Sequence, residues 1–126
     1  MHKKYKHQPL FYIVQYPDNN FYKIGFSRKI SQRFYTLNRY SPIKILPIFV
    51  GYNGIIKEKI FKQKYRPVRL ENKEFYILNN IVEIANEFEL IPIDLENIMP
   101  AMEREHPVIF FEMDIFYTKS NYTLTL

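Results

Sequence analysis

Two charged residues, Arg33 and Glu58, lie where a charged side chain needs either a partner or a function. Arg33 lies three residues after Ile30, on the face of a predicted helix that the apolar residues 30, 34 and 37 mark as buried. A charge on such a face needs a partner or a function, unless its stem packs while its head reaches water. Glu58 is the only carboxylate between Asp18 and Glu71, and four lysines surround it. It is either an ion-pair partner or a metal ligand that faces a phosphate site.

The charges are divided unevenly along the chain. Residues 1–70 hold fifteen Lys and Arg against two acids, a net +13, and residues 71–126 hold three against eleven, a net −8. Aromatic residues are interleaved with the basic ones, a pattern typical of nucleic-acid binding, where Lys and Arg release counterions from phosphates. The alternative is that the two halves neutralise each other within one fold or across a dimer.

Size and composition exclude several classes of protein. A chain of 126 residues that is 47% apolar predicts one folded domain. The absence of cysteine excludes disulfides and a cysteine-based zinc site. No apolar run approaches the roughly 18 residues of a membrane span, and the N-terminus is polar, so we expect no membrane association. We expect an intracellular protein, in the cytoplasm or nucleus of a host cell. The richness in Ile, Lys, Asn, Phe and Tyr suggests an AT-rich genome, such as that of a virus.

The two strands and the helix that follow the N-terminus would position Arg33. Residues 1–9 form a basic tail. Residues 10–25, LFYIVQYPDNNFYKIG, predict two aromatic-rich strands around a polar turn at 18–20. Ser27 is expected to cap a helix that runs through Asn38.

The next elements would position Glu58. Residues 45–52, ILPIFVGY, predict a third strand, in which Pro47 indicates an edge or a bulge. A helix over 55–65 then carries Glu58, although its lysines interrupt the apolar pattern formed by Ile56, Ile60 and Phe61.

The remaining elements complete the predicted fold. We expect a short strand over 74–78, a helix over 80–88 and a last strand over 108–118, whose FFEMDIFY mixes apolar and acidic residues. The exposed apolar edge of that last strand predicts a homodimer, formed by pairing with its copy in a second chain. The predicted fold class is therefore α/β (α+β), with a small central antiparallel sheet of about three strands flanked by helices.

Five short motifs occur in an order that belongs to a known family. LFY at 10–12 stands where that family has GIY, and KIG at 23–25 stands where it has YIG. Arg33 follows eight residues after the second motif, Glu58 begins EKIFKQKYRP, and KEFY at 73–76 precedes the last matching helix. The chain thus resembles the GIY-YIG nuclease superfamily, in particular the small branch of phages and large DNA viruses, also known from a meiotically up-regulated domain.

The resemblance divides the chain into a GIY-YIG-like domain over 10–90 and an acidic extension over 91–126. The first motif lacks its glycine, Lys62 stands where the branch often has histidine, and Lys73 replaces a glycine. The extension, which would contain the last strand, matches no known pattern.

The resemblance implies a divalent-metal-dependent endonuclease that cleaves phosphodiester bonds in duplex DNA. Glu58 would hold one Mg²⁺, with Mn²⁺ as an alternative, since such a cation binds through one carboxylate and several waters. Tyr12 would take the proton of the attacking water, and Lys23 would favour its phenolate. Arg33 would brace the scissile phosphate with its planar donors.

Other residues and a second function complete the hypothesis. The alternative is a catalytically weak or inactive module that keeps this fold and binds nucleic acid or a protein partner. In either case we expect contacts with the nucleic-acid backbone from Tyr22, Arg28, Arg39, Lys57 and Lys62.

Overall fold

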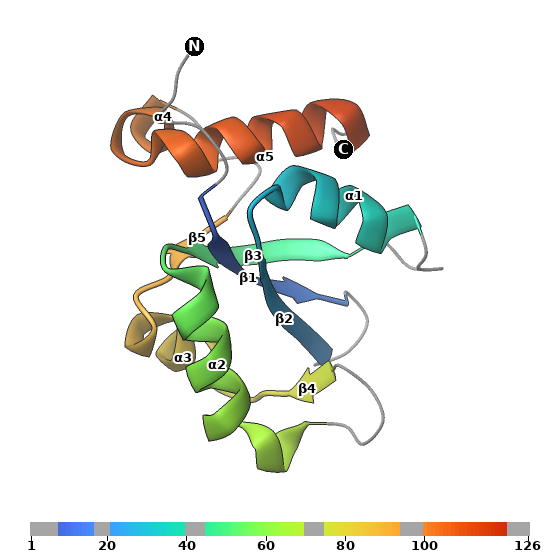
Figure 1. Cartoon of the computed structure of the whole chain (residues 1–126), viewed down its shortest axis with the longest axis vertical. Helices are drawn as coiled ribbons and strands as arrows, with labels where there is room; N and C mark the ends of the chain where they lie inside the picture. The colour runs from blue at the N-terminus through green and yellow to red at the C-terminus, as the bar shows by residue number, and fades with distance from the viewer. Residues whose placement is uncertain (1–7, 17–20, 40–44, 70–74, 94–99, 121–126) are drawn as a thin grey trace.

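The computed structural model describes residues 8–16, 21–39, 45–69, 75–93 and 100–120. An antiparallel sheet of five strands, in the order β4-β2-β1-β3-β5, lies between two layers of helices (Figure 1). The predicted fold class is confirmed, with two more strands than expected. The polar turn predicted at 18–20, most of the basic tail and Lys73 lie outside the described residues.

The central strand β1 (Leu10–Gln15) pairs with β2 (Phe21–Ser27) on one side and with β3 (Leu46–Gly51) on the other. Helices cover both faces of the sheet, so Leu10–Val14 is buried at every position. This explains an unbroken apolar run where a half-exposed strand would alternate. Alternate residues of β1 therefore belong to two separate cores.

Pro47 coincides with an irregularity in the pairing of β3. The register shifts between Ile13 and Val14, and Val14 then pairs with Pro47. Such an irregularity accommodates a residue that has no N–H to donate, as the edge or bulge predicted from Pro47 would. Beyond β3, the two-residue strand β5 (Ile91–Pro92) pairs with Phe49 and Val50.

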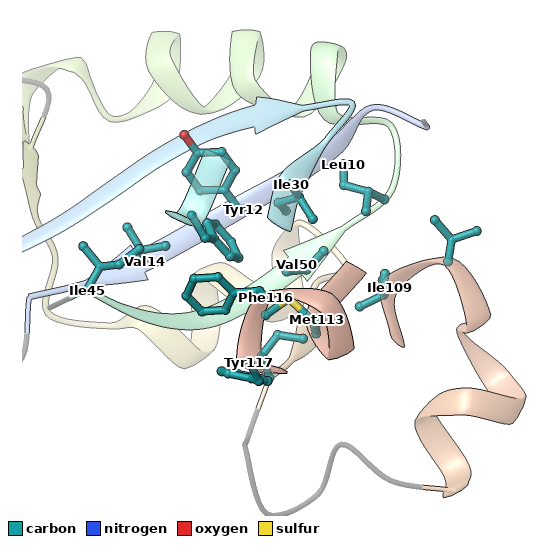
Figure 2. Close-up of a cluster of buried hydrophobic side chains, with 13 residues drawn as sticks. Leu10, Tyr12, Val14, Ile30, Ile45, Val50, Ile109, Met113, Phe116 and Tyr117 are labelled. Atoms are coloured by element: carbon teal, nitrogen blue, oxygen red, sulfur yellow. The ribbon is translucent and has the colours of Figure 1, made fainter. Parts of the chain in front are cut away.

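One helical layer consists of α1 (Ile30–Arg39) and α5 (Pro107–Ser120) (Figure 1). The predicted inner stripe of α1 is confirmed, because Ile30 and Phe34 are buried and Leu37 packs against the same core. Figure 2 shows this first core between the sheet and α5. Its members from β1 and α5 are Leu10, Tyr12, Val14, Val108, Ile109, Met113, Phe116 and Tyr117.

The other layer consists of α2 (Gly54–Lys64) and α3 (Ile81–Glu87). Phe61 is its centre, with ring centroids 5.9 Å from Phe11, 5.2 Å from Tyr76 and 5.4 Å from Phe88. Ile55, Ile56 and Ile60 of the same helix are all exposed. The inner stripe of α2 is therefore built from Gly54 and Phe61, and the isoleucines that the sequence offered as core face outward.

The short elements connect these layers. The 3-10 helix η2 (Arg66–Val68) follows α2, and strand β4 (Phe75–Ile77) pairs with Phe21–Lys23 of β2. Helix α4 (Pro100–Glu105) precedes α5. No helix in the described part of the chain has the length and apolarity needed to cross a membrane.

The predicted strand over 108–118 is wrong, because this segment is helix α5. Its buried residues recur with helical period, at 108, 109, 112, 113, 116 and 117. The sequence pattern suggested a strand because Glu112 was expected to be exposed, and an exposed residue at 112 interrupts the helical stripe. In the structure Glu112 is buried and belongs to that stripe. A homodimer through a C-terminal strand edge therefore has no structural basis.

Two neighbouring substitutions test which side of α2 faces the sheet. Phe61→Ala is expected to lower the free energy of unfolding by about 3–5 kcal/mol, because it empties the centre of the second core. Ile60→Ala should lower it by less than about 1 kcal/mol, because its side chain is half exposed. Urea denaturation measures both. Equal costs would mean that the isoleucine side of α2 is the buried one.

Candidate active site

A hydrogen bond joins two of the predicted catalytic residues. Arg33 Nε donates to the hydroxyl oxygen of Tyr12 at 3.0 Å. The Tyr12 ring projects from β1 into the first core, where the Phe34 ring meets it edge to face at 5.2 Å. Arg33 and Phe34 are consecutive in α1, so this one turn of helix fixes both the ring and the hydroxyl of Tyr12. The inner-facing charge of Arg33 thus has a defined partner.

Gly25 allows the Tyr12 ring to cross β2. Tyr12 and Gly25 are paired across the two strands, and the ring lies over that position, with its hydroxyl directed past β2 (Figure 2). A Cβ atom at Gly25 would lie 2.6 Å from the Tyr12 hydroxyl oxygen and 2.9 Å from Cζ. The glycine of the KIG motif is therefore required by this close approach, and its backbone needs no positive φ.

An open groove of about 490 Å³ lies where β2 leads into α1. Arg33 lines it, so the same side chain reaches both the groove and the Tyr12 hydroxyl. The other lining residues are Phe26, Ser27, Arg28, Lys29, Gln32 and Thr36. Three cations and several hydroxyl or amide groups suit an anionic ligand with many oxygen atoms, such as a phosphodiester.

Lys23 lies on the same face of the sheet as Tyr12. It pairs with Val14, and Tyr12 pairs with Gly25, so the two side chains are diagonal neighbours across the β1–β2 ladder. Lys23 is only 8% exposed, and its Nζ lies 5.7 Å from the centroid of the Phe75 ring. A cation over an aromatic face is attracted to it, which helps to hold this charge out of bulk water.

Glu58 comes from the opposite helical layer. It lies four residues after Gly54 and three before Phe61, so it shares the inner stripe of α2. Its side chain is 23% exposed and lies 3.6 Å from Lys62. Gly54 packs closely on Phe26, which also lines the groove. The first turn of α2 thus borders the same stretch of β2 as the groove, from the other side of the sheet.

The donor set around Glu58 fits only a cation that keeps most of its waters. Among the described residues no three His, Cys, Asp or Glu side chains cluster as metal ligands. One water-accessible carboxylate is compatible with Mg²⁺, which commonly binds through one or two carboxylates, waters and substrate phosphate oxygens. Such a cation has to compete with the ammonium group of Lys62 for the carboxylate.

Two of the five predicted backbone contacts are withdrawn from the surface. Tyr22 is buried in the second core, where burial raises its pKa and Gln15 Nε2 donates to its hydroxyl at 3.5 Å. Its burial disfavours the predicted contact with a nucleic-acid backbone. Lys57 is partly buried, and this burial lowers its pKa while Glu89 opposes the shift.

The other three predicted contacts are exposed, but they are not together. Arg28 lines the groove, Arg39 ends α1, and Lys62 lies on α2 beside Glu58. Sequence reasoning missed Lys29 and Gln32 as lining residues. Their signal is helical spacing, because Lys29 lies four residues before Arg33 and Gln32 four residues after Arg28, which brings each pair together at the start of α1.

The structure brings some of the predicted site residues together and leaves others apart. Tyr12 and Arg33 are in contact, Lys23 shares their face of the sheet, and Glu58 approaches from the other layer. Comparisons with models of known protein families, with curated proteins and with solved structures found no match. The assignment to the GIY-YIG superfamily stays a prediction that rests on the motifs and on this geometry.

A double-mutant cycle tests the close approach of Tyr12 to Gly25. Gly25→Ala is expected to lower the free energy of unfolding by about 1–3 kcal/mol, because the new methyl group overlaps the Tyr12 hydroxyl. In a Tyr12→Phe background the cost should be smaller, because that oxygen is gone, but not zero, because Cζ remains. Chemical denaturation of the four proteins gives the coupling energy. Equal costs in both backgrounds would contradict this placement of the ring.

Proposed function

We propose that the protein is a divalent-metal-dependent endonuclease of the GIY-YIG type that cleaves phosphodiester bonds in DNA. The observation that carries the proposal is the hydrogen bond between Arg33 and Tyr12 at the edge of a basic groove. Phosphodiester cleavage needs donors for the phosphoryl oxygens and a base for the attacking water. Arg33 supplies such a donor and Tyr12 such a base, and the two residues lie 21 positions apart in the chain.

Arg33 would bind the scissile phosphate in the groove. Its planar guanidinium can donate to two phosphate oxygens at once, and Arg28 and Lys29 add positive charge at the same wall. Exposed cations of this kind bind the DNA backbone irrespective of sequence. The groove therefore accounts for positioning of DNA and does not by itself account for sequence preference.

Tyr12 would take the proton of the attacking water. The guanidinium of Arg33 contacts the phenol oxygen, and the ammonium group of Lys23 lies on the same face of the sheet. Tyr12 is 1% exposed, so this role requires Arg33 to move from the hydroxyl towards the bound phosphate. Transfer of Arg33 would open the hydroxyl to water at the moment when DNA is present.

Glu58 would hold the cation on α2, whose first turn packs against the end of β2 that borders the groove. When bound, a divalent cation neutralises charge on the phosphoryl oxygens and on the leaving oxygen. The residues of the chain have the remaining tasks: Lys62 has to release the carboxylate, and Phe26 and Gly54 keep the first turn of α2 against β2.

A second candidate function is a nucleic-acid-binding module without catalysis. Two observations favour it. Tyr12 is buried, so its hydroxyl is not open to an attacking water, and Glu58 is paired with Lys62, so its carboxylate is not free to bind a cation. The basic groove supports binding in either case.

Nicking of supercoiled plasmid in Mg²⁺, Mn²⁺ or EDTA tests the proposed activity. Arg33→Lys, Tyr12→Phe and Glu58→Gln should each slow nicking by at least about 100-fold, because each removes a group from the transition state. Glu83→Gln on the exposed side of α3 is the matched control and should cut like the wild type. Circular dichroism checks that each variant is folded.

The outcomes separate the two functions. Cleavage retained by purified Glu58→Gln would contradict the nuclease assignment. Binding of DNA in EDTA, together with no cleavage by the wild type in Mg²⁺ or Mn²⁺, would favour the binding module.

The salt dependence of DNA binding tests the groove independently of catalysis. Arg28→Ala and Lys29→Ala should each reduce the slope of log K against log salt by about 0.9, if each side chain contacts one phosphate. Lys59→Ala, an exposed lysine of α2 outside the groove, should leave the slope unchanged. Fluorescence anisotropy with a labelled duplex measures the slope in EDTA. Equal slopes for all four proteins would place the DNA elsewhere.

A further inference from the structure

Glu112 is a buried carboxylate with a defined partner on another helix. It is 6% exposed in α5, and its Oε1 accepts a hydrogen bond from the backbone N–H of Ser31 at 2.9 Å. Ser31 is the second residue of α1, where backbone N–H groups have no partner within the helix. A side chain 81 residues away in sequence therefore caps the helix that carries Arg33.

The start of α1 has an electrostatic need for this cap. Its first turn contains no acidic residue, and Arg28 and Lys29 immediately precede it. Cations at a helix N-terminus are unfavourable, because the aligned peptide dipoles already make that end positive. Ser27 Oγ accepts from the N–H of Lys29 at 3.0 Å, and Lys29 lies before the first residue of α1. The carboxylate of Glu112 supplies negative charge on the buried side of the α1 N-terminus. The groove lies on the opposite, solvent-facing side.

The same face of α5 fixes α1 at a second point. Phe116, one helical turn after Glu112, meets the Phe34 ring edge to face at 5.4 Å. Phe34 in turn packs on Tyr12. Arg33 lies between these two anchors, two residues after Ser31 and one before Phe34, so both anchors set its position.

We propose that Glu112 is a positioning residue that holds the N-terminus of α1 and thereby places Arg33 between the Tyr12 hydroxyl and the groove. The acidic C-terminal part of the chain thus contributes to the site from behind it. The structural half of this inference stands without the nuclease, whereas its effect on cleavage rests on the proposed function.

Three full-length variants test the proposal. Glu112→Ala should speed hydrogen exchange of the Ser31 N–H about tenfold and shift the Arg33 Nε–H signal in NMR spectra, because the cap is lost. It should lower kcat for nicking about 10- to 100-fold with KM for DNA within about twofold, since Arg33 is displaced while the surface cations remain. Glu112→Gln keeps an oxygen acceptor but loses the negative charge, so it should recover part of the wild-type exchange protection and part of kcat.

Met113→Ala is the matched control, because Met113 is the buried neighbour of Glu112 in the same core. It should lower thermal stability without moving the Arg33 signal or kcat. Equal effects of Met113→Ala and Glu112→Ala, or an unchanged Arg33 signal in Glu112→Ala, would overturn the proposal. If the wild type does not cut DNA, the nuclease assignment fails, and the NMR measurements alone still decide the role of Glu112.

Discussion

The Tyr12 side chain is the contact on which the rest of the site depends. Its ring fills the space between the sheet and α1, its hydroxyl lies against Gly25, and Arg33 donates to that hydroxyl. A tyrosine so enclosed has one available orientation, because close-packed neighbours leave no space for another. It couples the strand pairing of β1 and β2 to the placement of α1, and hence to the groove along that helix.

Helix α5, near the C-terminus, holds α1 in this arrangement. Helix α5 packs on α1 through Phe116, whose ring meets that of Phe34, and it caps α1 with Glu112. The cap offsets the unfavourable interaction of Arg28 and Lys29 with the positive end of the α1 helix dipole, so these cations can line the groove. At this point of the fold, a buried carboxylate from the acidic C-terminal part lies behind the basic residues of the groove.

Much of the fold could be read from local patterns. The hairpin, the inner stripe of α1, the pairing irregularity at Pro47 and the order of elements up to Phe88 follow from periodicity and from turn and proline chemistry. The sequence indicated that Arg33 requires a partner, because it lies on the core-facing side of its helix. It did not indicate that the partner is the Tyr12 hydroxyl. The isoleucines of α2 and the strand over 108–118 were misread, because hydrophobicity alone does not reveal which face of a helix meets the sheet.

The sequence by itself determined the residue types at the candidate site and their spacing, because short-range patterns fix strands, helices and the faces of a regular helix. Only the tertiary structure decided which of those residues meet. It placed Arg33 on Tyr12, buried Tyr22, moved Glu58 to the other helical layer and joined Glu112 to Ser31. These outcomes depend on contacts between residues far apart in the chain, and the free energy of such contacts is set by packing and burial that no local pattern contains.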